Sequence, residues 1–200
     1  AIVAASQGGP YGAACAYALS KSLACLTLVS GVAGLEDDDV MSTQNRMIKA
    51  QIFMARHTPA LLTLQYNLMR PMLKGKRGER LVRSILSSLP ESDQHTLSMP
   101  GAIDLMVEDL REGIRQGGMG ATDDMRAVVL DWGFELEDIT TEVFVWQGED
   151  DPNVTPAMAR YMTARISNSK ATFVPGAGHF LIYSHWHDIL QQVLDHWGQS

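Results

Sequence analysis

The fold is decided near the start of the chain, where residues 1–19 read AIVAASQGGPYGAACAYAL. Residues 1–5 form a short, continuous apolar run, which is typical of a buried strand. Residues 6–9 contain two glycines and predict a sharp turn, and the alanine-rich residues 10–19 predict a helix that packs closely on its neighbours. The stretch therefore predicts a strand, a tight turn and a helix, with Ser6 at the turn.

The same pattern returns further along the chain. Residues 26–31 form a second short apolar run that ends on glycine, so a strand, a helix and a strand follow one another and imply a parallel pair. Two further strands are expected at residues 143–147 and 171–174, and two further helices at 156–166 and 185–197. The sequence therefore predicts an α/β fold, with a mostly parallel sheet flanked by helices.

Strand signals stop between residues 36 and 131, where helix-length stretches are separated by prolines and by a glycine pair. We expect a helical insertion over 36–131, between core segments 1–35 and 132–200. Nine of the eleven methionines lie in this insertion, from Met41 to Met125. Methionine adapts to irregular apolar surfaces, so these residues suit either ordinary helix packing or a pliable lining for an apolar substrate.

Composition indicates a globular chain with one main domain and an insertion: 200 residues, 46% hydrophobic, with a formal net charge of -7. This charge argues against nucleic acid or an anionic membrane as partner. No apolar run is long enough to span a membrane and no signal peptide is recognisable, so we expect a cytoplasmic location. Cys15 and Cys25 are expected to be small core residues. One basic cluster is interpreted as the solvated side of a helix, with a phosphate or lipid site as the alternative: Lys74, Lys76, Arg77, Arg80 and Arg83.

Three segments supply side chains that could act together in catalysis. Ser6 lies between a strand and a helix, although a serine there could also simply cap the helix. Asp150 and Asp151 lie in the loop after the strand expected at 143–147, and His179 follows the strand expected at 171–174. These loops meet at the carboxyl edge of a parallel sheet. A serine hydroxyl becomes a useful nucleophile when a histidine takes its proton and a carboxylate orients that histidine.

These segments resemble the α/β-hydrolase family. SQGGPY at residues 6–11, followed by LVSG at 28–31, resembles the turn, helix and next strand around that family's nucleophile. FVWQGED at 144–150 with Asp151, and GAGH at 176–179, resemble its acid and histidine loops. The resemblance implies that Ser6 is the nucleophile, His179 the base and Asp151 the acid, with the backbone N–H of Gln7 in the oxyanion hole. Together these segments imply a partial α/β-hydrolase fold with a helical cap insertion.

Two alternatives exist for the acid. Asp150 is adjacent, but Asp151 has the spacing from Gly148 that the resemblance implies. A rarer family variant takes its acid from the loop after the strand expected at 26–31, here the acidic run at residues 36–39. We interpret that run, which comprises Glu36, Asp37, Asp38 and Asp39, as a solvated helix start.

The sequence departs from the family pattern in two respects. Ala4 replaces the first glycine of the nucleophile turn. The strands that precede this turn in the family, and the loop among them that supplies a second oxyanion donor, are not found in this sequence. We therefore expect the strand at residues 1–5 to have an open edge, through which the chain could associate with itself.

We expect hydrolysis of a small, apolar ester or related acyl compound. Relatives that open epoxides or carbon–halogen bonds use an aspartate at the position of Ser6, so those activities are disfavoured. The alternative is a truncated, non-catalytic relative or ligand-binding module. No cofactor or metal is implied, since His185 and His187 have no evident third ligand. The other histidines are weaker candidates: His57 and His95 in the insertion, and His196, expected on the surface near the C-terminus.

Overall fold

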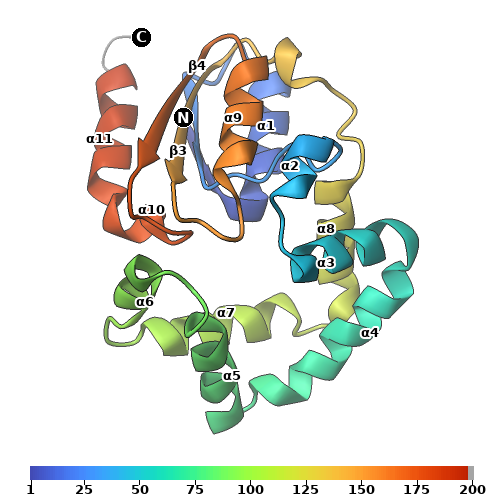
Figure 1. The fold of residues 1–200 in the computed structure, drawn as a ribbon. Coiled ribbons are helices and arrows are strands. Elements are labelled where there is room, and N and C mark those ends of the chain that lie inside the picture. Colours follow the sequence, from blue (N-terminus) through green and yellow to red (C-terminus); the bar gives the residue numbers. More distant parts are fainter. Residues whose placement is uncertain (198–200) are drawn as a thin grey trace. The chain divides into compact units, whose positions relative to one another are not determined.

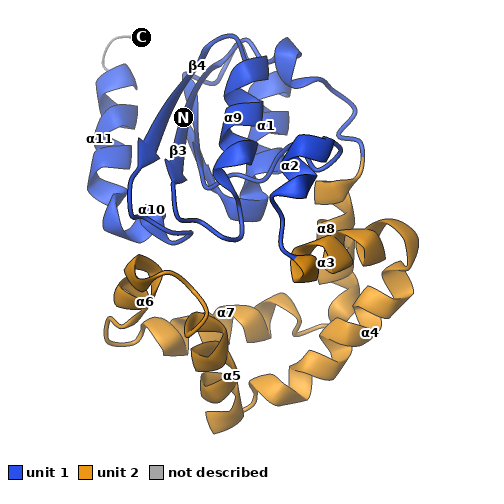
Figure 2. Cartoon of the chain, in the orientation of Figure 1, with its two compact units in different colours: residues 1–45, 131–200 blue, residues 46–130 orange. Residues whose placement is uncertain are grey.

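The computed structural model describes residues 1–197, which fall into two compact units. Unit 1 comprises residues 1–45 and 131–200, and unit 2 comprises residues 46–130 (Figure 2). The chain therefore leaves unit 1 once, forms unit 2, and then returns to complete unit 1.

Unit 1 alternates strands and helices along the chain (Figure 1). Its strands are β1 (Ile2–Ala5), β2 (Cys25–Val29), β3 (Glu142–Gly148) and β4 (Ser169–Val174). Its helices are η1 (Ser6–Gly8), α1 (Gly9–Ala18), α2 (Asp38–Ser42), η3 (Leu136–Asp138), α9 (Pro156–Arg165), α10 (Leu181–Ser184) and α11 (Trp186–Trp197). The four strands expected from the sequence are all present, which confirms the predicted α/β class.

The four strands form one sheet in the order β1-β2-β3-β4, and every neighbouring pair is parallel. Leu26 of β2 is paired with Ile2 of β1 on one side and with Val143 of β3 on the other. All five residues of β2 are buried, as are six of the seven residues of β3, whereas most of β1 and β4 is partly exposed. Within the described residues, β1 and β4 are therefore the edge strands.

Helices cover both faces of this sheet, because alternate residues of the central strands point to opposite sides. Leu26 and Leu28 pack in one cluster with residues of α1 and α9. Trp146 belongs to a second cluster with Leu181 of α10 and Ile189 of α11 on the opposite face. Because β2 is buried on both faces, its sequence is a continuous apolar run without alternation.

Helix α1 lies unusually close to the sheet at Gly12. A Cβ atom at this position would lie 2.8 Å from the Cβ of Ala4 and 2.9 Å from Cδ1 of Leu26. Gly12 thus makes room for the methyl group of Ala4, which stands where the family pattern has glycine. The methyl group of Ala4 therefore fits between β1 and α1.

The helical unit begins later than the sequence analysis expected, at residue 46 and not at residue 36. Asp37 caps the short helix α2 by accepting hydrogen bonds from the backbone N–H groups of Asp39 and Val40, at 3.0 and 3.1 Å. Thr43 and Gln44 then hydrogen-bond to Thr155 of unit 1, at 2.7 and 3.1 Å. These polar contacts, which hydrophobic periodicity does not reveal, attach residues 36–45 to unit 1.

Unit 2 is entirely helical in its described residues. Its helices are α3 (Arg46–His57), α4 (Pro59–Met69), η2 (Arg70–Leu73), α5 (Lys76–Leu86), α6 (Glu91–Leu97), α7 (Ala102–Gly113) and α8 (Gly118–Val129). Helices α4 and α8 pack closely because Gly118 has no side chain: a Cβ there would lie 2.6 Å from the carbonyl oxygen of Thr63. Asn67 accepts a hydrogen bond from the backbone N–H of Gly118 at 2.9 Å, which fixes the pair. None of the helices in residues 1–197 has the length and apolar character needed to cross a membrane.

Candidate active site

Ser6 occupies a strained turn between β1 and the helical segment that leads into α1. Its φ angle is 52°, one of two positive values among the non-glycine residues described. Such a conformation costs on the order of 1–3 kcal/mol and persists only where the surroundings enforce it. Gly9 contributes by letting the start of α1 approach the chain after β2, since a Cβ there would lie 3.1 Å from both Cα of Gly31 and N of Val32. The backbone N–H of Val32 also donates to the carbonyl of Ser6 at 3.1 Å.

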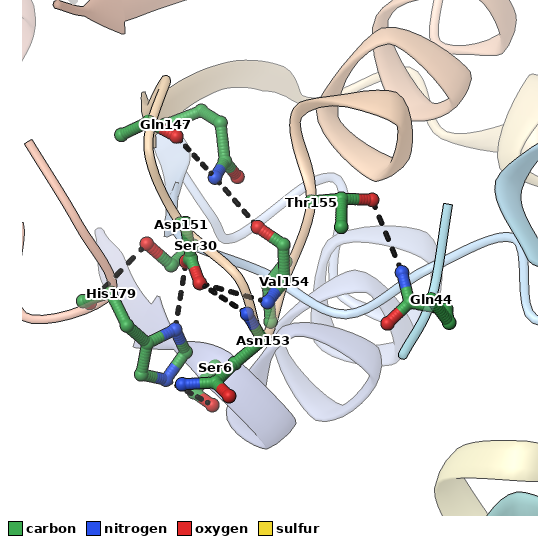
Figure 3. Close-up of polar contacts among 10 residues, drawn as sticks. Ser6, Ser30, Gln44, Gln147, Asp151, Asn153, Val154, Thr155 and His179 are labelled. Atoms are coloured by element: carbon green, nitrogen blue, oxygen red, sulfur yellow. Dashed lines mark hydrogen bonds and ion pairs between the residues drawn. The ribbon is translucent and has the colours of Figure 1, made fainter. Parts of the chain in front are cut away.

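Ser6, His179 and Asp151 form a continuous hydrogen-bonded chain at the carboxyl edge of the sheet (Figure 3). The Nε2 atom of His179 lies 3.0 Å from Oγ of Ser6, and its Nδ1 atom lies 2.8 Å from Oδ2 of Asp151. The side chain of Asp151 is fully buried and that of His179 is 14% exposed. A buried carboxylate on Nδ1 favours the tautomer with hydrogen on Nδ1, which leaves Nε2 free to accept the serine proton.

Backbone donors fix the second oxygen of the Asp151 carboxylate. Its Oδ1 accepts hydrogen bonds from the N–H groups of Asn153 and Val154, at 2.8 and 3.0 Å (Figure 3). One oxygen is therefore held by the loop while the other faces the imidazole. The sequence indicates this orientation only indirectly, through the spacing between Gly148 and Asp151 in the loop.

The loop that carries Asp151 and the loop that carries His179 lie in direct contact. Gly148, the last residue of β3, has no room for a side chain, since a Cβ there would lie 2.4 Å from the carbonyl oxygens of both Ala177 and Gly178. The backbone N–H of Asp150 donates to the carbonyl of Ala177 at 3.0 Å. Gly148 is thus the position at which the acid and histidine loops come together.

Gln147 is a supporting residue that the sequence analysis did not identify. It is fully buried at the end of β3, and its Nε2 donates to the carbonyl of Val154 at 2.8 Å and to that of Gly148 at 3.0 Å. These bonds tie together the two ends of the loop that holds Asp151 (Figure 3). The available signal was a polar residue closing an otherwise apolar strand, which is costly to bury unless it is hydrogen-bonded.

Ser30 is a second supporting residue that the sequence analysis missed. It follows β2, is buried, and has the other positive φ among non-glycine residues, 46°. Its N–H donates to the carbonyl of Trp146 at 2.8 Å, and its Oγ lies 3.4 Å from the carbonyl oxygen of His179. The residue that follows β2 therefore contacts the histidine loop, although it is no member of the Ser6–His179–Asp151 chain.

The alternative acids lie elsewhere. Asp150 is exposed and participates through its backbone N–H. Glu36 accepts a hydrogen bond from the hydroxyl of Tyr161, and Asp37 is the cap of α2, so the acidic run begins a helix as expected. Burial, and then the hydrogen bond to Glu36, raise the pKa of Tyr161. Arg165 lies over the Tyr161 ring, 3.8 Å from its centre.

The remaining histidines do not join this constellation. His57 is exposed and packs against Phe53, with ring centres 4.7 Å apart, and His95 is exposed on α6. His185 lies 2.9 Å from the hydroxyl of Ser184. Among the described residues, no group of three His, Cys, Asp or Glu side chains could hold a metal ion.

His196 lies partly exposed on α11 near the end of the described chain, and it is anchored by contacts that the sequence did not indicate. Its Nε2 atom hydrogen-bonds to the carbonyl of Ala24 at 3.1 Å, and its Nδ1 atom lies 3.2 Å from Glu142. Its ring also meets the edge of Phe144. The amphipathic pattern of α11 did not reveal this anchor because the partners, Ala24 just before β2 and Glu142 of β3, are far away in sequence.

Gln7, the expected oxyanion donor, follows Ser6 in the η1 turn and has an exposed side chain. Its backbone N–H therefore lies at the start of the helical segment, where backbone dipoles favour negative charge.

Cys25 is buried, as expected, and burial raises the pKa of its thiol, whereas Cys15 is partly exposed.

Comparison with known proteins places this architecture in a family. The family model described as the alpha/beta hydrolase family matches residues 1–192. The chain belongs to the alpha/beta hydrolase family. No curated protein sequence matches this alpha/beta hydrolase significantly.

Solved structures of similar fold include three named enzymes. An enol-lactonase from Burkholderia xenovorans LB400 has a TM-score of 0.61 and 16% identity, covering 98% of this alpha/beta hydrolase and 64% of the enol-lactonase chain. A 2-hydroxy-6-oxo-6-phenylhexa-2,4-dienoate hydrolase from Rhodococcus sp. strain RHA1 has a TM-score of 0.62 and 14% identity, covering 98% and 62%. A bromoperoxidase from Bacillus anthracis has a TM-score of 0.62 and 14% identity, covering 98% and 66%. At these identities the likeness concerns the fold, and the present chain spans about two thirds of each structure's length.

Proposed function

We propose that this alpha/beta hydrolase cleaves an ester or related acyl substrate through a covalent acyl-enzyme on Ser6. The observation that carries the proposal is the unbroken hydrogen-bonded chain from Ser6 Oγ through His179 to Asp151, with both bonds at 3.0 Å or less. A nucleophile, a base within hydrogen-bond distance and a carboxylate that orients the base are the groups that acyl transfer needs.

In the first half of the reaction, Ser6 Oγ attacks the substrate carbonyl carbon while its proton moves to Nε2 of His179. The resulting imidazolium is stabilised by the buried carboxylate of Asp151. The negative charge on the former carbonyl oxygen is stabilised by the backbone N–H of Gln7 and the adjoining helical segment. His179 then protonates the leaving alkoxide, the carbon–oxygen bond to the alcohol breaks, and the acyl group remains on Ser6.

In the second half, water replaces the alcohol. His179 takes a proton from water, the hydroxide attacks the acyl carbon, and the proton on His179 returns to Ser6 as the acid leaves. The two half-reactions together consume one water molecule and regenerate Ser6 and His179, and no step requires a redox or metal cofactor. An apolar acyl compound is the proposed substrate class.

The test is labelling of the purified chain with a fluorophosphonate, followed by intact mass. We expect one label per chain, lost in Ser6→Ala and in His179→Ala, and slowed by about 10⁴-fold in Asp151→Asn because the histidine tautomer is then wrong. Circular dichroism verifies that each variant is folded. Hydrolysis of a panel of aryl esters and lactones then follows turnover directly.

Ser184 provides a matched control, because its hydroxyl lies 2.9 Å from Nδ1 of His185 on the exposed surface. That pair has a hydroxyl and an imidazole, but no carboxylate of residues 1–197 hydrogen-bonds to His185. We expect Ser184→Ala to label at the wild-type rate. A folded wild-type sample that takes no label would contradict the proposal and favour the non-catalytic alternative.

A further inference from the structure

The charges of this protein are separated along the chain, which the overall net charge of -7 conceals. Residues 46–90 of unit 2, which include α3, α4, η2 and α5, contain nine Lys or Arg and a single acidic residue, Glu79. Residues 91–130 contain three Lys or Arg and eight acidic residues. One half of unit 2 is therefore strongly basic although the protein as a whole is acidic.

The basic half of unit 2 also contains an apolar groove of about 500 Å³. This volume lies within the range of small-molecule sites, roughly 300–1,000 Å³. Helix α4 supplies most of the lining, and its side chains at spacings of three and four residues form one stripe. The lining includes Met54, Leu61, Leu64, Leu68, Met72 and Leu81.

The α4 stripe is exposed to a degree that is unusual for leucine. Leu61, Leu64 and Leu68 are 52%, 51% and 63% exposed. Leu61 and Leu68 are seven residues apart, which corresponds to about 10 Å along a helix. The lining thus follows α4 for about two turns and consists almost entirely of hydrocarbon and thioether groups, which suits a flexible alkyl chain.

Two basic residues lie close in sequence to the groove-lining residues of η2 and α5, Met72 and Leu81. Arg77 is four residues before Leu81 and therefore lies on the same face of α5. Lys74 follows Met72 by two residues, and both cations are exposed. Within residues 1–197, no carboxylate is recorded in an ion pair with either of them. An apolar groove with cations close to its lining residues is complementary to a molecule with a hydrocarbon tail and an anionic head.

We propose that this groove of unit 2 binds a single-chain anionic amphiphile of the fatty-acid class. The alkyl chain lies along α4 against Leu64 and Leu68, and the carboxylate lies at Lys74 and Arg77. The site is formed by unit 2 alone and does not depend on the hydrolytic activity proposed for Ser6. The basic cluster was interpreted from the sequence as the solvated side of a helix, with a phosphate or lipid site as the alternative. The proposed site corresponds to that alternative.

The experiment is isothermal titration of the full chain with dodecanoate, and with dodecyl maltoside as a probe with the same tail and a neutral head. We expect saturable dodecanoate binding that weakens as salt is added, because the ionic part of the interaction is screened. Leu64→Gln and Leu68→Gln should each weaken binding about tenfold. Arg77→Gln should weaken dodecanoate about fivefold and leave the maltoside unchanged.

Two matched controls lie outside the groove, on the acidic half of unit 2. Leu105→Gln on α7 and Arg126→Gln on α8 alter exposed residues of the same types, and both should bind dodecanoate like the wild type. The groove variants replace exposed side chains, so their folds should be intact, which circular dichroism verifies. Protein labelled beforehand with a fluorophosphonate should bind equally well, which separates this site from Ser6.

Three results would overturn the proposal. The first is absence of dodecanoate binding by the folded protein. The second is equal binding by the groove variants and the controls. The third is binding to vesicles that contain anionic phospholipid without any binding of monomeric dodecanoate, which would assign the surface to membranes and not to a single chain.

Discussion

Replacing Gly148 by alanine tests whether contact between the acid and histidine loops sets the geometry of the site. The added Cβ would lie 2.4 Å from the carbonyl oxygens of Ala177 and Gly178, and ordinary contact requires about 1 Å more. Both neighbours are backbone atoms, so the two loops must separate. A displacement of about 1 Å at a catalytic group costs about a hundredfold in rate. We also expect a loss of about 1–3 kcal/mol in the free energy of unfolding, as in other overpacked sites.

The assay is the rate of fluorophosphonate labelling of Ser6, with urea unfolding measured on the same samples. Gly120→Ala is the matched control, because Gly120 lies in α8 and a Cβ there meets no atom within 4 Å. The control should label normally and gain up to about 1 kcal/mol, since alanine favours helix more than glycine does. If Gly148→Ala labels at the wild-type rate with unchanged stability, the loop contact does not set the geometry.

Three further changes test other parts of unit 1. Gln147→Met removes the amide that holds the carbonyl of Val154 and should lower the free energy of unfolding by about 1–3 kcal/mol, with slower labelling of Ser6. Thr141→Val removes a buried hydrogen bond to the carbonyl of Ala16 and should cost about 1 kcal/mol without slowing labelling. Tyr161 has a raised pKa, so its folded form holds the proton more tightly than the unfolded form. Its contribution to stability is therefore complete below about pH 10 and is lost as the pH rises above that value, and Tyr161→Phe should flatten this alkaline loss.

The urea midpoint of unfolding and the rate of Ser6 labelling, measured for each variant, test these three predictions. If stability and labelling both stay at the wild-type values, Gln147 does not support the loop that holds Asp151. Slower labelling of the Thr141 variant would mean that the C-terminal end of α1, where Ala16 lies, influences the geometry of the turn at Ser6. Parallel curves of urea midpoint against pH for wild type and Tyr161→Phe would refute the assignment of the alkaline loss to Tyr161.

The sheet and its order of elements were predictable because the decisive signals are local. The apolar run of β2, buried on both faces, and the glycine turn after β1 each identify their own element without reference to distant residues. The positions of Ser6, Asp151 and His179 at strand ends followed from the same patterns. The hydrogen bonds that join these three side chains depend on the register of the parallel strands, and local sequence patterns do not determine that register.

The parts that could not be predicted depend on contacts between distant segments. The segment around Asp37 was expected in the insertion, because nothing in its sequence shows that Thr43 and Gln44 bond to Thr155. The contacts of His196 were not predicted for the same reason, since its partners are Ala24 and Glu142. The catalytic role of Ser6, the ester substrate, self-association through the β1 edge and the cytoplasmic location remain predictions.

The position of unit 2 within the chain has a consequence for how this protein could be re-engineered. Ser6 precedes the segment Arg46–Leu130, Asp151 and His179 follow it, and the bonds that align the three side chains all lie within unit 1. Recombination at residues 45 and 131 would exchange the whole helical module while leaving Ser6, Asp151 and His179 untouched. A library of chimaeras built at these two junctions could then vary ligand preference without altering the residues proposed to carry out hydrolysis.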